Sequence, residues 1–208
     1  MWYVKSEMAK RRETRAETAA RTRKSLISAA AAEFSDRGLD ASLDAICARA
    51  GVTRGAFYVH FADRDALISA VMDDVIGDLM RSLVERAPAS RAGGALAQAI
   101  RLFFTAAAAR SPAIHRGGAL RFHHLMDACH RSPAIGATYR NLVVAARDQI
   151  SAAIRSDQTA DTTRADLKPD ALADLMTIVA LGTAAALELE IPVDLDRLRA
   201  TTTAIAKA

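Results

Sequence analysis

The sequence predicts an all-α fold, and three observations support this class. Of its 208 residues 51% are hydrophobic and only 5% are aromatic, a composition that favours closely packed helices. Apolar residues recur at intervals of three and four along most of the chain, which is the spacing of amphipathic helices. No run of β-branched residues alternates with polar ones, so the sequence indicates no strand.

The first helix is expected over residues 23–36, because its apolar residues share one side and Gly38 stands where it would end. Residues 1–22 are polar and rich in lysine and arginine, and they predict a basic N-terminal arm. Such an arm either remains solvated or follows a DNA backbone. Met8 is an alternative start of the protein.

One stretch after this helix carries the most specific pattern in the chain. Helical spacing relates Leu43, Ile46, Cys47 and Ala50. Ser42 precedes them as an N-cap, and Gly51 follows them where a left-handed conformation favours glycine. Thr53 caps a second short helix, in which Phe57 and Phe61 share one side. This layout predicts a helix-turn-helix, whose second helix enters the major groove of DNA.

These residues resemble the signature of the TetR family of bacterial transcriptional regulators. The turn reads Ala-Gly-Val-Thr at residues 50–53, and the second helix reads Gly-Ala-Phe-Tyr-Val-His-Phe at residues 55–61. The connection over residues 39–41 is shorter than the family's commonest pattern. The resemblance implies a three-helix DNA-binding head (residues 23–66) followed by a larger helical body (residues 67–208) for effector binding and dimerisation.

The exposed face of a recognition helix reads the bases. Arg54 is the candidate base reader, because a guanidinium can bind guanine O6 and N7 together. Gly55 has no side chain and lets the helix approach DNA closely. Tyr58 follows Arg54 by one turn, where it can contact a thymine methyl group or a phosphate.

Phosphate contacts are expected from four further residues. Ser42 and Thr53 suit phosphate oxygens at the helix N-termini, although both act as caps without DNA. The resemblance implies that His60 and Arg64 also contact phosphates, with Arg64 in place of the more usual lysine. Outside this motif, His60 would be an ordinary surface or half-buried histidine.

The rest of the chain predicts a helical body. Asp63 is expected to cap a fourth helix that is apolar on much of its circumference and therefore connects head and body. Further helices are expected over residues 95–110, 112–130, 133–156, 169–190 and 193–208. Loops are expected over residues 87–94 and 157–169, where the helical spacing is interrupted.

The last two helices are the predicted dimer interface. Small and apolar residues lie along them at Leu175, Val179, Gly182, Ala186, Val193, Leu195, Leu198 and Ile205. These residues either close the core of one subunit or, as the resemblance implies, form a four-helix bundle between two subunits. A dimer would place one head on each half of a palindromic DNA site.

The middle of the body is where an organic effector is expected. A mixed apolar and polar pocket would be lined by Phe104, Phe122, His123 and Met126. His123, Asp127 and His130 share a helical face, so a metal site is an alternative, although no second segment converges on them. Neither a metal nor another cofactor is predicted.

Charge, cysteines and motifs restrict the class of function. The net charge of +4 suits a polyanionic partner. Two cysteines without metal spacing predict a reducing cytoplasm and no disulfide. No signal peptide or membrane span is expected. The chain has no nucleophile elbow, phosphate-binding loop or dinucleotide fingerprint, so an enzyme is not expected.

The sequence therefore predicts a cytoplasmic, homodimeric repressor that binds operator DNA and is released by a small molecule. A DNA-binding regulator without such an effector, or an activator, is the alternative. A metal-binding protein or enzyme that uses His123, Asp127 and His130 is a third possibility.

Overall fold

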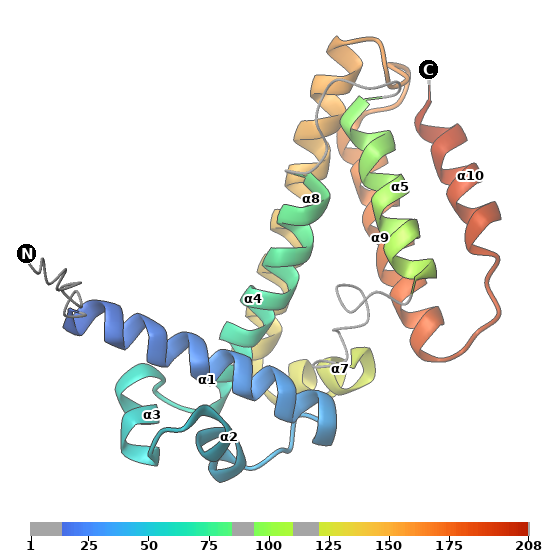
Figure 1. Cartoon of the computed structure of the whole chain (residues 1–208). Coiled ribbons are helices and arrows are strands. Elements are labelled where there is room, and N and C mark those ends of the chain that lie inside the picture. The colour runs from blue at the N-terminus through green and yellow to red at the C-terminus, as the bar shows by residue number, and fades with distance from the viewer. Residues whose placement is uncertain (1–13, 85–93, 110–120, 208) are drawn as a thin grey trace, which may run out of the picture.

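The computed structural model describes residues 14–84, 94–109 and 121–207. Helices joined by turns make up this part of the chain, with one isolated bridge between Thr163 and Lys207. The predicted all-α class is confirmed. Figure 1 shows α1, α2 and α3 at one end of two long neighbouring helices, and α5, α9 and α10 toward the other end.

The head consists of α1 (Arg15–Arg37), α2 (Leu43–Ala50) and α3 (Arg54–His60). The first helix begins at Arg15 and not near residue 23, so that prediction was wrong. Thr14 and Glu17 form a capping box: the Thr14 hydroxyl accepts from the Glu17 N–H at 3.2 Å, and the Glu17 carboxylate accepts from the Thr14 N–H at 2.7 Å. Part of the predicted basic arm is thus helical, whereas residues 1–13 lie outside the described residues.

An ion pair between a buried glutamate and an exposed arginine fixes α2 against α1. Glu33 of α1 is only 3% exposed, and it accepts a hydrogen bond from Arg49 Nε at 2.7 Å. Arg49 also donates to Asp36 at 2.9 Å, and the bond to Glu33 is the largest cause that raises the pKa of Arg49. A buried carboxylate without a partner costs several kcal/mol. The ion pair with Arg49 therefore offsets the cost of burying the Glu33 carboxylate at this contact between the two helices.

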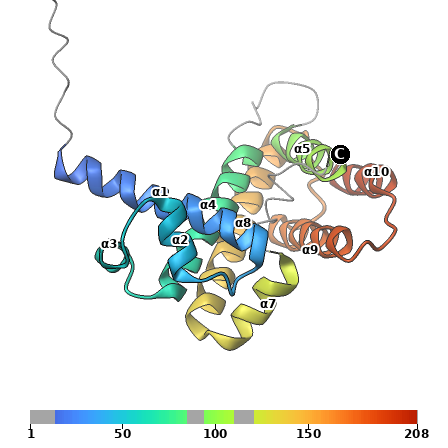
Figure 2. The same cartoon turned by 60° about the horizontal axis from the view of Figure 1, so that its bottom comes forward.

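The body contains the remaining helices of the described chain, α4 (Arg64–Val84), α5 (Gly94–Ala108), α7 (Phe122–Arg131), α8 (Pro133–Thr159), α9 (Pro169–Glu188) and α10 (Leu195–Ala206). The long helices α4 and α8 rise side by side from the head (Figure 1). α5 and α9 pack against α8, and α10 packs on α5, while α7 lies beside the head. Figure 2 shows the same placement of α7 from a second direction.

Several predicted helix starts are confirmed by their caps. Asp63 accepts from the Ala66 N–H at 2.8 Å, and Ser132 accepts from the Ile135 N–H at 3.4 Å. Pro169 occupies the first turn of α9, as predicted. The expected start of a helix at residue 112 and most of the expected loop over residues 87–94 lie outside the described residues.

The predicted end of α8 near residue 156 was too early, because the helix continues to Thr159. Asp157 in this last turn is buried and accepts from the backbone N–H groups of Ala95 and Leu96, at 3.0 and 2.7 Å. These N–H groups belong to the first turn of α5, where backbone N–H groups have no acceptor within the helix. The carboxylate of Asp157 thus joins two helices far apart in the sequence.

Two hydrophobic cores hold the described residues together. The head core joins α1, α2, α3 and the first half of α4 with Leu125 and Ala128 of α7 and Ile135 of α8. The body core joins α5, α9 and α10 with Ile154, near the far end of α8. The head core is therefore completed by residues from the middle of the chain, and α8 contributes to both cores.

The helix α9 is apolar but only partly covered. Only 22% of its most apolar stretch is buried. Length and composition alone would let α9 cross a membrane, but one such helix is weak evidence. Asp170 and Asp174 of α9 form ion pairs with Arg155 and Arg147 of α8, each at 2.7 Å. The uncovered side of α9 is typical of a surface that meets a partner.

Candidate nucleic-acid interface

The helix-turn-helix has the predicted caps at both of its helices. The Ser42 hydroxyl accepts from the Ala45 N–H at 3.1 Å, and the Thr53 hydroxyl accepts from the Ala56 N–H at 3.2 Å. Gly51 ends α2 in the left-handed conformation with φ 69°. A Cβ added at Gly51 would meet nothing within 4 Å. The turn therefore requires glycine for its backbone conformation and not for space.

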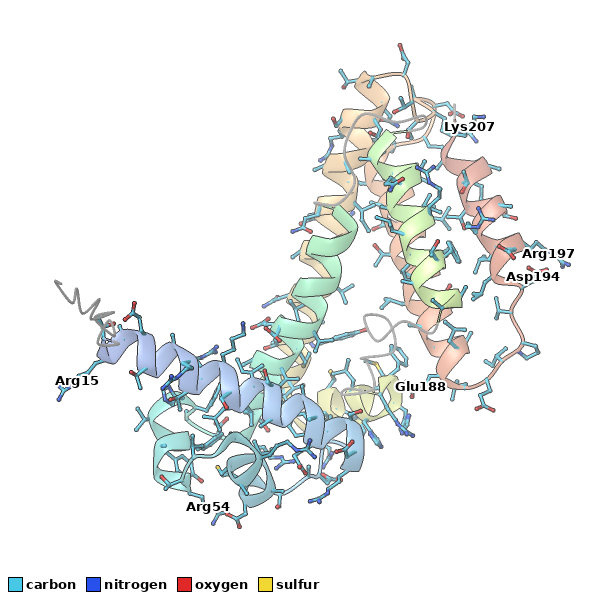
Figure 3. All side chains as sticks on the ribbon, in the orientation of Figure 1. Arg15, Arg54, Glu188, Asp194, Arg197 and Lys207 are labelled. Atoms are coloured by element: carbon cyan, nitrogen blue, oxygen red, sulfur yellow. The ribbon has the colours of Figure 1, made fainter. Side chains whose placement is uncertain are left out.

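The recognition helix α3 separates its core residues from its exposed ones. Phe57 is 0% exposed, and its ring centroid lies 5.6 Å from that of Phe61, which is also buried. Tyr58 and Val59 are 59% and 79% exposed. Arg54 lies at the outer edge of the head in Figure 3. One face of α3 is thus free to meet a DNA groove.

Val59 is a further exposed residue of α3, and helical spacing in the sequence could have identified it. Val59 follows Gly55 by four residues, so the two positions lie on one helix face. Both are exposed. An apolar side chain on this face is suited to contact a thymine methyl group.

Arg54 makes an ion pair with Asp44 of α2, with Nε 2.9 Å from Oδ1. The two side chains are 61% and 70% exposed. An ion pair this exposed contributes little to stability. It keeps the guanidinium on the outer surface of the helix-turn-helix, and only a weak interaction has to be replaced when Arg54 meets another acceptor.

The structure places Arg64 and His60 differently from the other predicted contacts. The Arg64 guanidinium donates to the Leu39 carbonyl and lies 5.7 Å from the centre of the Phe34 ring. This half-buried arginine thereby connects the start of α4 to the segment between α1 and α2. His60 is half-buried at the end of α3, whereas Ser42 and Thr53 are exposed.

Basic residues of α1 lie near the recognition helix. Arg15, Arg23 and Lys24 are exposed, and the Arg23 guanidinium lies 5.0 Å from the centre of the Phe61 ring. Figures 1 and 2 both show the N-terminal half of α1 next to α3. Positive charge therefore accompanies the exposed face of α3, which favours binding of a polyanion.

The residues expected to line an effector pocket are divided between α5, which carries Phe104, and α7, which carries the other three. Phe104 is buried in the body core, whereas Met126 packs against the head core. Phe122 is half-buried and His123 is exposed, both in the first turn of α7. Their common role in effector binding stays a prediction.

Two of the residues considered for a metal site have other partners. Asp127 forms an ion pair with Arg131 at 2.9 Å, and His123 contacts Glu188. Within residues 14–84, 94–109 and 121–207, no group of three or more potential ligands converges.

Comparison with known proteins adds to this geometry. Residues 26–71 match the model of the family described as bacterial regulatory proteins, tetR family. Over 57 residues the chain is 44% identical to the A-factor receptor protein of Streptomyces griseus. This match covers 27% of the chain and 21% of that protein, so the chain matches about a fifth of the relative's length.

Solved structures resemble most of the chain. GusR of Salmonella enterica has a TM-score of 0.71 at 18% identity, covering 94% of this chain and 98% of that one. A complex of SmeT with triclosan has a TM-score of 0.67 at 23% identity, covering 88% and 89%. SmeT is described as the repressor of the Stenotrophomonas maltophilia multidrug efflux pump SmeDEF. At these identities the likeness shows the fold.

Fold and motif together define a helix-turn-helix protein with an appended helical body. The match over residues 26–71 shows that the head is similar to the DNA-binding region of bacterial regulatory proteins of the tetR family, and the likeness to solved structures extends over most of the fold.

Proposed function

We propose that the protein is a transcriptional regulator that binds operator DNA through α3. The observation that carries the proposal is the exposed face of α3, with Arg54, Gly55, Tyr58 and Val59 outside and Phe57 held in the head core. A helix presented in this way fits the major groove. Such a regulator would work in the bacterial cytoplasm, where the DNA is.

Bases and phosphates are assigned to different residues in this proposal. Arg54 and Tyr58 read bases, and Gly55 allows the close approach. Ser42 and Thr53 are exposed at helix N-termini, where hydroxyl and N–H groups suit phosphate oxygens. His60 and Arg64 remain proposed phosphate contacts, but Arg64 would have to leave the Leu39 carbonyl.

Replacing Arg54 with alanine is expected to weaken binding to operator DNA by about 1–3 kcal/mol and to relax the preference at one base pair. The reason is the loss of a bidentate contact to guanine. The measurement is a titration of operator variants and of random DNA. Arg155→Ala is a matched control, because Arg155 is also an exposed arginine paired with an exposed aspartate, and it lies near the end of α8 that is far from α3 (Figure 1). Equal losses on operator and random DNA would exclude base reading by Arg54.

We infer that two copies associate through α9 and α10, so that these two helices of each subunit form a four-helix bundle. Ala171, Leu175, Ile178 and Gly182 lie at helical spacing on α9, and all are exposed. A second copy would cover this stripe with the same stripe, as a two-fold axis requires. Leu195, Leu198 and Ile205 of α10 instead pack against the body core, so α10 would meet the partner with its other residues.

The proposal also includes repression of transcription and release of the protein from DNA by a small organic molecule. The fold of SmeT, which is a repressor and was solved with triclosan, supports them by analogy. The residues proposed for the effector are Phe104, Phe122, His123 and Met126. A regulator without an effector, or an activator, is the alternative.

The test is selection of bound DNA from a random library with the full chain. A palindromic consensus is expected, since two heads related by a two-fold axis read two half-sites. A compound screen by thermal shift then separates the alternatives, because an effector stabilises the fold by mass action. A compound that raises the melting temperature and releases the DNA supports effector control; recovery of no consensus contradicts the DNA-binding proposal.

The idea of an enzyme or metal protein through His123, Asp127 and His130 is not favoured, since two of these residues are paired elsewhere. Metal analysis of purified protein tests it directly. Stoichiometric zinc that survives dialysis would revive it.

A further inference from the structure

The carboxylate of Glu188 caps a helix from another part of the chain. Glu188 is the last residue of α9, and it accepts hydrogen bonds from the backbone N–H of Phe122 and from that of His123, the latter at 3.2 Å. These are the first N–H groups of α7, and Arg121, at its N-cap position, provides no side-chain bond. Glu188 thus supplies the cap that the local sequence lacks.

The imidazole of His123 adds a third contact to the same carboxylate, because its Nδ1 also lies in hydrogen-bonding contact with Glu188. Burial raises the pKa of Glu188, but the hydrogen bonds from His123 and from the backbone N–H groups outweigh this and hold that pKa below its usual value. The Glu188 side chain is 22% exposed. The end of α9 is therefore attached to the start of α7 by hydrogen bonds to a carboxylate that is largely shielded from water.

The other contacts of α7 are with α8, which follows it in the chain, and with the head. Leu125 and Ala128 are buried in the head core. The His124 ring lies against Gly38 at the end of α1, where an added Cβ would be 2.9 Å from His124 Cε1. Arg131, the last residue of α7, lies 3.8 Å from Asp40. α7 is thus packed between the head and α8 and is held by α9 at its first turn.

The three figures agree on this arrangement. Figures 1 and 2 place α7 between the end of α1 and the end of α9, and Figure 3 places Glu188 at the end of α9 that faces α7. This connection is short, since α7 has only 10 residues. It runs beside the longer connection through α4 and α8, and it begins at the helix proposed to meet the second subunit.

We propose that Glu188 is a positioning residue that, through α7, sets the orientation of the head relative to α9 and so the separation of the two heads in the dimer. This inference rests on the proposed function, in which α9 lies in the dimer interface. Loss of the Glu188 cap frees the first turn of α7 from α9. The head itself stays folded, because Leu125 and Ala128 still fill its core. Binding to one half-site is therefore retained while binding to two correctly spaced half-sites weakens.

The experiment uses the full chain, the selected palindrome, versions of it with altered centre spacing, and a single half-site. For Glu188→Gln and Glu188→Ala, the affinity for the single half-site is expected to stay within about twofold, while the affinity for the palindrome falls by about tenfold, a usual size for coupling between sites. The preference among spacings is expected to broaden or shift. His123→Ala, which removes only the ring contact, is expected to act in the same direction with a smaller change.

Asp157→Asn is the matched control. Asp157 also caps a helix from a distance, but its contacts join α8 to α5 within the body. This variant is expected to lower the melting temperature without changing the ratio of palindrome to half-site affinity.

Three outcomes would overturn the inference. The first is a lower melting temperature of the Glu188 variants with an unchanged affinity ratio and spacing preference, which would make Glu188 merely structural. The second is equal weakening on half-site and palindrome, which would mean that the head itself is damaged. The third, seen already with the unmodified chain, is the absence of any preference for paired half-sites; it would refute the proposed dimeric DNA binding as well and is recognised before any variant is made.

Discussion

Replacing Phe57 with alanine is expected to lower the free energy of unfolding by about 3–5 kcal/mol, the usual cost of removing a buried aromatic ring. Phe57 is 0% exposed, and its ring packs against that of Phe61 and edge-on against that of Tyr58. The cavity left by the ring would lie directly beneath α3. Binding to operator DNA is therefore expected to fall together with stability. Urea denaturation at a fixed protein concentration measures the change.

Val59→Ala is the control for this prediction, because Val59 lies on the same helix but is 79% exposed. Its replacement is expected to change the free energy of unfolding by less than about 0.5 kcal/mol, as is usual for a surface position. If Phe57→Ala and Val59→Ala had equal effects on unfolding, α3 would not be anchored through its inner face.

Replacing Ile178 with glutamate is expected to convert the proposed dimer into monomers. The Ile178 side chain is 66% exposed on α9, and a two-fold interface would bury it in both subunits. Losing two buried isoleucines costs about 3–6 kcal/mol, and the two new carboxylates would also be brought together in the interface. Sedimentation measures the subunit mass. Binding to the palindrome is expected to weaken to the level of a single half-site.

Val144→Glu is the matched control for Ile178→Glu. Val144 is also an apolar residue, 54% exposed on α8, but it lies outside the α9 stripe. Its replacement is expected to leave the subunit mass unchanged. If Val144→Glu separated the subunits and Ile178→Glu did not, the interface would lie on α8 and the proposed use of α9 would be wrong.

The parts of the fold that were predictable from the sequence depend on short-range chemistry. Ser42 and Thr53 determine where α2 and α3 begin, and Gly51 determines where α2 ends, in each case through bonds within a few residues. The limits of α2 and α3 could therefore be predicted from the sequence. The same holds for Asp63 and Ser132, which cap α4 and α8 within three residues.

The start of α1 is also marked by a short-range signal in the sequence. Thr14 and Glu17 have the spacing of a capping box, and the alanines after them favour a helix, so the start of α1 could have been predicted from the sequence. The basic composition of this segment suggested an unstructured arm instead. Composition proved a poorer guide here than the two residues that cap the helix.

Contacts between distant segments could not be predicted. The carboxylates of Asp157 and Glu188 cap helices 61 and 66 residues away in sequence, and no local pattern marks their partners. Arg64 matched a phosphate-binding position, but its guanidinium is held by the Leu39 carbonyl. The exposed face of α9 could not be predicted either, because its apolar residues point in several directions and only packing decides which of them are covered.

The composition of the head core has a consequence for building chimeric regulators. A graft of the DNA-binding module alone would transfer α1, α2, α3 and the first half of α4. Here such a graft would separate Phe34, Leu67 and Met72 from Leu125, Ala128 and Ile135, which fill the same core. A transplanted head would need the donor's α7 and the first turn of α8 as well. The transferable unit of this protein is therefore discontinuous in sequence.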